Sequence, residues 1–226
     1  MGKHEFDGKS NRVMREQPTC LIVDDHPIVR KGIRDLLIQE GGCSYVIEAE
    51  NAAMALELVQ RQAWGLLILD IALPDKHGIE VLKEIKFLRP NQPVLMLSLY
   101  PEREFALRAL KAGASAYLTK DRAPTELLDA MKEVMAGRRY ITASLASEIA
   151  AYLETGRPVT PHALLSNREL EVLRLFGQGN LVSAIADRMA LSVKTISTYR
   201  RRLLDKLRLR TTADLVRYAI ENKLTM

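Results

Sequence analysis

Five short apolar runs alternate with five longer segments of helical periodicity in the first two thirds of the chain, and this alternation restricts the fold more than any other feature. Strands that alternate with helices form a parallel sheet with helices on both faces. We therefore expect a doubly wound α/β fold built from five βα units. The expected strands are 20–23, 45–49, 66–69, 94–98 and 116–119, and the expected helices are 29–39, 52–62, 77–89, 102–112 and 125–136.

Only helical patterns follow this region. One helix is expected over 143–154, before the segment TGRPVTP at 155–161, whose glycine and two prolines oppose regular structure. Four more helices are expected over 167–176, 181–189, 193–207 and 212–222. The predicted organisation is a flexible tail over 1–17, an α/β domain over 18–138, a linker with a helix over 139–163, and an all-α four-helix domain over 164–226.

The formal net charge of +5 is distributed unevenly along the chain. Residues 157–226 contain 13 Lys and Arg against 6 Asp and Glu, which gives +7 for this segment and leaves −2 for the rest. A basic C-terminal segment behind a mildly acidic domain indicates that polyanion binding is confined to the C-terminal part. Charge alone is also compatible with an ordinary solvated basic face.

Composition predicts a cytoplasmic protein without a membrane partner. The apolar runs are far shorter than the roughly 20 residues that a helix needs to cross a bilayer. The first 17 residues are polar and charged, without the apolar stretch of a secretory signal. Cys20 and Cys43 lack the paired spacing typical of zinc or redox sites, and we expect both to be reduced packing residues.

Acidic, hydroxyl and cationic residues lie where the expected strands end. Asp24 and Asp25 follow the first strand, Asp70 the third, and Lys120 the fifth, while Ser98 ends the fourth. In a doubly wound sheet these strand ends meet at one edge. Grouped carboxylates repel one another unless a cation lies among them, and their oxygens suit Mg²⁺. A carboxylate can also accept a phosphoryl group, whose charge a lysine would balance. Taken singly, each residue also fits a helix cap, a strand end or a solvated charge.

Taken together, these residues resemble the receiver domain of two-component response regulators. The resemblance rests on the segments LIVDDH at 21–26, LDIALP at 69–74 and KAGASAYLTK at 111–120, together with Ser98. It implies that Asp70 is the phosphoacceptor. It also implies a magnesium site formed by Asp25, Asp70 and the backbone carbonyl of Ala72, with Asp24 acting through water.

The same resemblance implies a switch. Ser98 and Lys120 are expected to contact the phosphoryl group, and Tyr117 is expected to change rotamer as Ser98 moves inward. Leu99 occupies a position where the family usually has a small residue, which affects the expected rates of phosphoryl transfer and hydrolysis.

A helix-turn-helix is predicted in the C-terminal domain. Ser166 lies three residues before Glu169 and ahead of an apolar run, which is the spacing of a capping box. Ser192 is the expected N-cap of the helix over 193–207, and a tight turn separates this helix from the preceding one. The second helix of such a pair enters the major groove of DNA. The alternative interpretation of residues 193–207 is an ordinary amphipathic helix whose polar face is solvated and binds no DNA.

The segments LSNRELEVL at 165–173 and SVKTISTY at 192–199 resemble the LuxR-type helix-turn-helix. With a receiver in front, the chain resembles the NarL/FixJ family of response regulators. This resemblance implies base contacts from Ser197, Thr198 and Arg201, phosphate contacts from Lys194, Thr195, Arg202 and Lys206, and dimer contacts from Leu215 and Val216. The implied partners are double-stranded DNA, a sensor histidine kinase or phosphotransfer protein, and a second phosphorylated copy. The implied activity is regulation of transcription and not enzymatic turnover.

Two other functions fit parts of the pattern. A phosphohydrolase could use Asp70 as its nucleophile, but enzymes of the haloacid-dehalogenase type need a second aspartate two residues later, where this chain has Ala72. A DNA-binding protein controlled by a small ligand would leave the acidic site inactive. The presence of all five expected side chains argues against this alternative.

Overall fold

The N-terminal domain contains a five-stranded parallel sheet. A computed structural model describes residues 18–155 and 160–225, and the predicted tail over 1–17 and the linker residues 156–159 lie outside this description. The strands are β1 (Thr19–Val23), β2 (Tyr45–Ala49), β3 (Leu66–Asp70), β4 (Val94–Ser98) and β5 (Ala116–Thr119). Their order in the sheet is β2-β1-β3-β4-β5, with every neighbouring pair parallel. The predicted doubly wound α/β fold is confirmed.

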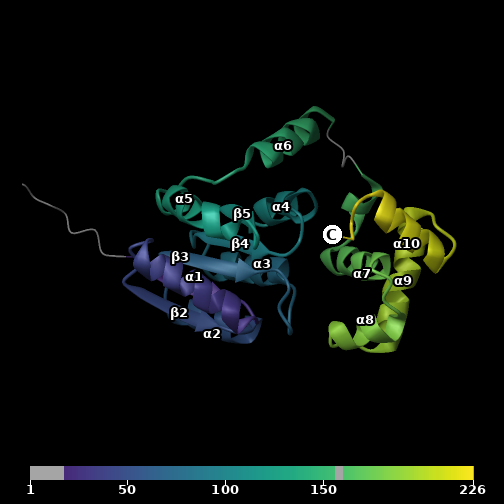
Figure 1. Ribbon diagram of the computed structural model, residues 1–226, viewed down its shortest axis with the longest axis horizontal. Helices are drawn as coiled ribbons and strands as arrows, with labels where there is room; N and C mark the ends of the chain where they lie inside the picture. Colours follow the sequence, from purple (N-terminus) through teal and green to yellow (C-terminus); the bar gives the residue numbers. More distant parts are fainter. Residues whose placement is uncertain (1–17, 156–159, 226) are drawn as a thin grey trace, which may run out of the picture.

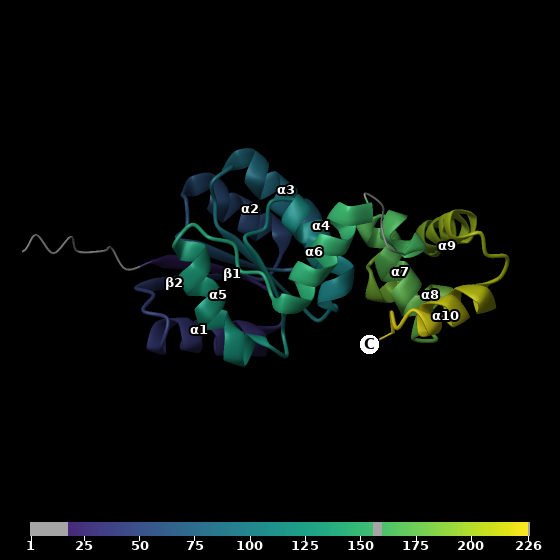
Figure 2. The same ribbon diagram turned by 90° about the horizontal axis from the view of Figure 1, so that it is seen from above.

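Helices cover both faces of this sheet (Figure 1). The helices α1 (Pro27–Gln39) and α5 (Ala123–Met135) pack on one face, and α2 (Ala52–Arg61), α3 (Gly78–Leu88) and α4 (Glu102–Lys111) pack on the other (Figure 2). Successive strand residues point to opposite faces. Leu21 and Leu67 therefore join the core under α2 and α3, while Ile22 and Ile68 join the core under α1 and α5.

The C-terminal domain is helical, as predicted. It contains the 3-10 helix η1 (Pro161–Leu164) and the helices α7 (Asn167–Gly177), α8 (Val182–Arg188), α9 (Val193–Leu207) and α10 (Thr212–Glu221). The α6 helix (Ala143–Thr155) precedes it and packs against α4. The predicted capping box at the start of α7 is present, because Ser166 and Glu169 each accept a hydrogen bond from the other's backbone N–H. Within the described residues, no helix is long and apolar enough to cross a membrane.

Gly78 holds the start of α3 directly against the end of β3. Its backbone N–H donates to the carbonyl of Ile71 over 2.7 Å. A methyl group on Gly78 would lie 2.1 Å from the carbonyl oxygen of Asp70 and 2.7 Å from Cα of Ile71, far inside van der Waals contact. Backbone this close can form only at a glycine, so Gly78 fixes the position of the loop that follows Asp70.

We predict that Gly78→Ala destabilises the α/β domain by about 1–3 kcal/mol, because the added methyl group must push two backbone segments apart. The matched control is Gly32→Ala in the middle of α1, where a methyl group meets no atom within 4 Å. The control should stabilise the domain by about 0.5–1 kcal/mol through the better helix propensity of alanine. Urea unfolding followed by circular dichroism measures both changes, and equal effects of the two substitutions would contradict the assigned role of Gly78.

Candidate functional site

Five predicted site residues lie together at the carboxyl edge of the sheet. Asp24 follows β1, Asp70 ends β3, Ser98 ends β4 and Lys120 follows β5. The Nζ atom of Lys120 lies 2.6 Å from Oδ2 of Asp24 and 2.7 Å from Oδ2 of Asp70. Asp24 and Asp70 are both only 1% exposed, whereas Asp25 is exposed. A single ammonium group therefore neutralises part of the charge of two buried carboxylates.

The surroundings shift the pKa values of both Asp70 and Lys120. Burial raises the pKa of Asp70, the charge of Lys120 opposes this increase, and the neighbouring Asp24 adds to it. Burial alone would lower the pKa of Lys120, but Asp70 and Asp24 together raise it. Lys120 therefore stays protonated, and the ionised form of Asp70 is disfavoured relative to a solvent-exposed aspartate.

The acidic cluster has the donor set of a hard-cation site. Ligand atoms of Asp24, Asp25, His26 and Asp70 all lie within 4.8 Å of one another. Three of these four residues offer carboxylate oxygens, which fit Mg²⁺. The Nδ1 atom of His26 lies 2.7 Å from Oδ1 of Asp25 and 3.1 Å from Oδ1 of Asp24. The predicted ligand Ala72 lies beside the cluster, and its backbone N–H donates to Oδ1 of Asp70 over 3.3 Å.

The two predicted switch residues meet at a third residue, Tyr100. The Oγ atom of Ser98 accepts a hydrogen bond from the backbone N–H of Tyr100 over 3.0 Å. The hydroxyl of Tyr117 donates to the backbone carbonyl of Tyr100 over 2.8 Å, and the Tyr117 side chain is 1% exposed. Burial raises the pKa of the Tyr117 phenol, so the hydroxyl remains a donor. Tyr117 is thus in an inward position.

The side chain of Tyr100 extends from this loop to the helical domain. Its hydroxyl donates to Oε1 of Glu171 on α7 over 3.1 Å, and the guanidinium carbon of Arg174 lies 4.5 Å from its ring centroid. Arg174 also forms an ion pair with Glu104 on α4 over 2.8 Å, with side chains only 5% and 1% exposed. Arg108 on α4 donates to backbone carbonyls of η1. Figure 2 shows α4 facing α7 across this contact.

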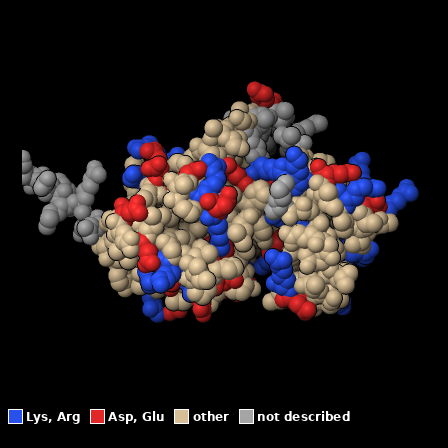
Figure 3. Space-filling view, viewed as in Figure 1, with Lys and Arg blue, Asp and Glu red and all other residues tan. Residues whose placement is uncertain are grey.

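Helix α9 presents polar and basic side chains to solvent. Ser192 caps it by accepting from the backbone N–H of Thr195 over 3.0 Å. Its buried residues Ile196, Leu203 and Leu207 pack into the domain core, as the periodicity predicts. Five of the predicted DNA-contacting residues are exposed, namely Lys194, Ser197, Arg201, Arg202 and Lys206. The other two, Thr195 and Thr198, are half-buried. Figure 3 shows Lys and Arg side chains around the helical domain at the right.

Comparisons with known proteins match both parts of the chain. The response regulator receiver domain family matches residues 20–132, and the luxR family of bacterial regulatory proteins matches residues 163–219. The response regulator UvrY of Escherichia coli is 32% identical over 205 residues, which cover 90% of this chain and 94% of UvrY. BvgA of Bordetella pertussis, a putative positive transcription regulator of virulence factors, is 37% identical over 204 residues, which cover 90% and 97%.

The chain belongs to the response regulator family.

Solved structures of response regulators share its architecture. A structure of RcsB from Salmonella typhimurium has a TM-score of 0.67 and 28% identity, and it covers 93% of this chain and 99% of RcsB. A structure of an RcsB–DNA complex has a TM-score of 0.56 and 28% identity, and it covers 89% of this chain and 97% of that chain. The response regulator described here therefore combines a receiver domain with a LuxR-type helical domain.

One predicted dimer residue of this response regulator lies inside its own domain. Leu215 on α10 is completely buried and belongs to the core formed with α7, so its side chain cannot contact a second copy. The sequence pattern did not separate the inward face of α10, which carries Leu215 and Ala219, from the outward one. Val216 is half-buried, and Ile220 on the same helix is 56% exposed.

Sequence reasoning missed the interdomain contact entirely. Tyr100, Glu104 and Arg174 carry it, and the last two are separated by 70 residues. Arg174 has the pattern of a surface residue on an amphipathic helix, and only the placement of α4 against α7 shows that it is buried.

We predict that Asp70→Asn stabilises the receiver domain at pH 7 in a chelating buffer. Since the folded-state pKa of Asp70 is raised above 3.8, the stability that this group contributes is present below pH 3.8 and is lost as pH rises through the raised value. The ionised group therefore opposes folding at neutral pH, and the variant should melt at higher temperature, by about 2–4 °C for each kcal/mol gained. The difference should shrink at pH 4.

Thermal unfolding with added Mg²⁺ completes this test. A cation bound at the acidic cluster should raise the melting temperature of the wild type more than that of Asp70→Asn, because the variant lacks one carboxylate ligand. A variant that melts no higher than the wild type at pH 7 in chelator would contradict the electrostatic assignment.

Proposed function

We propose that this response regulator controls transcription through phosphorylation of Asp70 by a histidine kinase or phosphotransfer protein. The observation that carries the proposal is the pair of ion contacts from Lys120 to Asp70 and Asp24 at the edge where the strands end. A carboxylate is a suitable nucleophile for a phosphoryl group, and a nearby ammonium group balances the added charge. We also propose that the protein acts in the cytoplasm, because a regulator of this kind must reach both DNA and the phosphodonor.

The phosphoryl transfer uses a small set of side chains. An oxygen of Asp70 forms a bond to phosphorus while the bond between phosphorus and the donor histidine breaks. Asp24, Asp25 and Asp70, with the carbonyl of Ala72, would hold Mg²⁺, which supplies positive charge to the phosphoryl oxygens when it is bound. Lys120 contacts the phosphoryl group after transfer. Ser98 provides a hydroxyl donor once it turns toward the acidic cluster.

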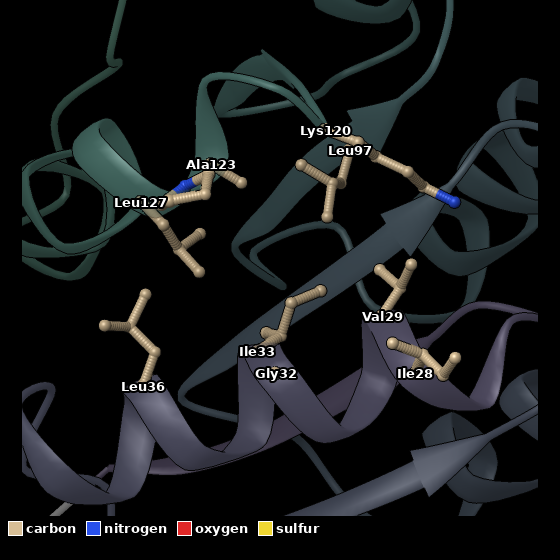
Figure 4. A pocket seen from close by; sticks show the side chains of 10 residues that line it. Ile28, Val29, Gly32, Ile33, Leu36, Leu97, Lys120, Ala123 and Leu127 are labelled. Carbon is tan, nitrogen blue, oxygen red and sulfur yellow. The ribbon is translucent and has the colours of Figure 1, made fainter.

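The donor protein is proposed to dock between α1 and α5. An apolar pocket of about 330 Å³ lies there, and Lys120 is one of its lining residues. Figure 4 shows apolar side chains of the two helices facing one another, with Lys120 beside them. Ile28 at this pocket is 88% exposed, although it is a large apolar residue next to the acidic cluster. A partner that covers Ile28 would gain apolar burial close to Asp70.

The signal is proposed to reach the helical domain through Tyr100. Ser98 is proposed to turn toward the phosphoryl group, and this turn breaks the hydrogen bond that its Oγ atom accepts from the backbone N–H of Tyr100. Movement of Ser98 therefore frees the backbone of Tyr100, whose side chain holds Glu171 and Arg174 of α7. Loss of these contacts weakens the interdomain contact and favours a dimer.

DNA binding is assigned to α9. Ser197, Thr198 and Arg201 are proposed to contact bases, and Lys194, Thr195, Arg202 and Lys206 are proposed to contact phosphates. Most of this face is already exposed while the two domains are in contact. The interdomain contact therefore regulates the placement of two helical domains on a two-fold site and does not cover α9. The outward face of α10, with Val216 and Ile220, is the proposed contact between copies.

We predict that acetyl phosphate with Mg²⁺ converts the wild type to a dimer and increases its affinity for a cognate promoter by about tenfold or more, an increase within the usual range of allosteric coupling. Asp70→Asn should show neither effect. Mass spectrometry detects the phosphoryl adduct, size-exclusion chromatography with light scattering measures the dimer, and fluorescence anisotropy measures promoter binding. Arg201→Ala is the matched control, since it should dimerise normally but bind DNA weakly. Equal dimerisation of the wild type and Asp70→Asn would remove phosphorylation from the mechanism.

We predict that Tyr100→Phe opens the interdomain contact without phosphorylation. The substitution removes the hydrogen bond to Glu171 and keeps the ring on Arg174, so the loss should be about 1 kcal/mol, or roughly a fivefold shift toward separated domains. Distances between spin labels on the two domains measure this shift. Tyr45→Phe, at a 54% exposed tyrosine on β2, is the control and should leave the distances unchanged. Identical distances in the two variants would contradict the role of Tyr100.

A further inference from the structure

The only two cysteines of the chain are in contact. Cys20 lies in β1 and is completely buried, and Cys43 lies in the loop between α1 and β2 and is 6% exposed. Their Sγ atoms are 2.8 Å apart, and both thiols are free. Their separation of 23 residues gave no indication of this contact, and the sequence pattern predicted two reduced packing residues.

The backbone holds the two thiols in this position. The N–H of Cys43 donates to the carbonyl of Leu37, and the N–H of Ser44 donates to the carbonyl of Pro18, just before β1. Gly42 adopts a φ of +67°, which a residue with a side chain rarely adopts, and so turns the chain back toward the sheet. Shortening the gap from 2.8 Å to the roughly 2.0 Å of a disulfide bond needs a movement of less than about 1 Å.

The two sulfur atoms are chemically unequal. The two thiols share a hydrogen bond, and this bond lowers the pKa of Cys43 despite its partial burial. The same hydrogen bond and burial raise the pKa of Cys20. Cys43 is also the more exposed of the two and adjoins the exposed residue Gly42. Cys43 is therefore the sulfur that reacts first, and Cys20 is the sulfur that follows.

We propose that Cys20 and Cys43 form a reversible intramolecular disulfide when the protein meets a peroxide. The Cys43 thiolate attacks one peroxide oxygen, the O–O bond breaks, and Cys43 becomes a sulfenic acid as the peroxide is reduced to water or an alcohol. The Cys20 sulfur then attacks the Cys43 sulfur, the S–O bond breaks, and water leaves with the Cys20 proton. Two thiols are oxidised by two electrons, and a dithiol reductant reverses the reaction.

The bond would close a loop that contains α1 together with Asp24 and Asp25. The C-terminal end of α1 would then be tied to the start of β1, at the end of the sheet opposite the acidic cluster. One wall of the apolar pocket, formed by Val29, Ile33 and Leu36, lies on this helix. Oxidation would therefore restrict the movement of α1 independently of phosphorylation.

The experiment treats the full-length protein with hydrogen peroxide and counts free thiols. We expect the count to fall from two to zero in a monomer whose mass decreases by two hydrogens, and dithiothreitol should restore both thiols. In Cys20→Ser, dimedone should trap a sulfenic acid at Cys43, whereas Cys43→Ser should react much more slowly. Circular dichroism of each variant confirms that it is folded before the measurement.

A rate comparison separates native pairing from chance oxidation. Since a fixed geometry raises the effective concentration of the second thiol, the step from the Cys43 sulfenic acid to the disulfide should be about tenfold or more faster in the folded protein than in urea, measured as the fraction of sulfenic acid that escapes capture by dimedone. Two thiols that persist under peroxide, disulfides between separate chains, or more complete escape from dimedone in urea would each overturn the proposal. Asp70→Asn should oxidise at the rate of the wild type, so failure of the phosphorylation mechanism leaves this test intact.

Discussion

The contact of Lys120 with two buried carboxylates is the interaction on which the receiver domain depends. Asp24 and Asp70 are almost without solvent, and their mutual repulsion is compensated by one ammonium group within 2.7 Å of both. Truncating Lys120 would leave two unpaired buried charges, a change that costs several kcal/mol in other proteins. Addition of a phosphoryl group or a cation changes the same balance. A change in the charge of the acidic cluster therefore changes the conformation that is most stable at the ends of the strands.

This coupling extends along the edge of the sheet. The backbone N–H of Lys120 donates to the carbonyl of Ser98 over 2.8 Å, so β4 and β5 move together where the acidic cluster is formed. The turn after β4 contains Tyr100, whose backbone is hydrogen-bonded to the side chains of both Ser98 and Tyr117. The ring of Tyr100 lies against Arg174 of the helical domain. Lys120, Ser98 and Tyr100 thus form a continuous chain of contacts between Asp70 and the interdomain contact.

The sequence predicted the elements whose periodicity is strong and missed the contacts that need three dimensions. The strands over 45–49, 94–98 and 116–119 have the predicted bounds, because buried parallel strands are short apolar runs with clear ends. The starts of α1 and α5 were placed two residues late, since each helix has a proline in its first turn and proline tolerates that position. The 3-10 helix η1 has only four residues, which are too few to show a helical periodicity in the sequence. Residues 69–74 and 111–120 indicated the acidic cluster, whereas no local pattern distinguishes a buried Arg174 from a solvated one.

The exposure of α9 restricts how the receiver can control the helical domain. A receiver that covered the DNA-binding face would act by occlusion, and release alone would then restore binding by one domain. Here Arg201 and Arg202 face solvent while α7 is held by α4, so each helical domain is already competent to approach DNA. Two such domains bind one two-fold site tightly only if their spacing matches the half-sites, about one helical turn apart. In the mechanism that we propose, the receiver holds α7 and prevents this spacing without covering α9, and release of α7 lets a dimer adopt the spacing of the half-sites.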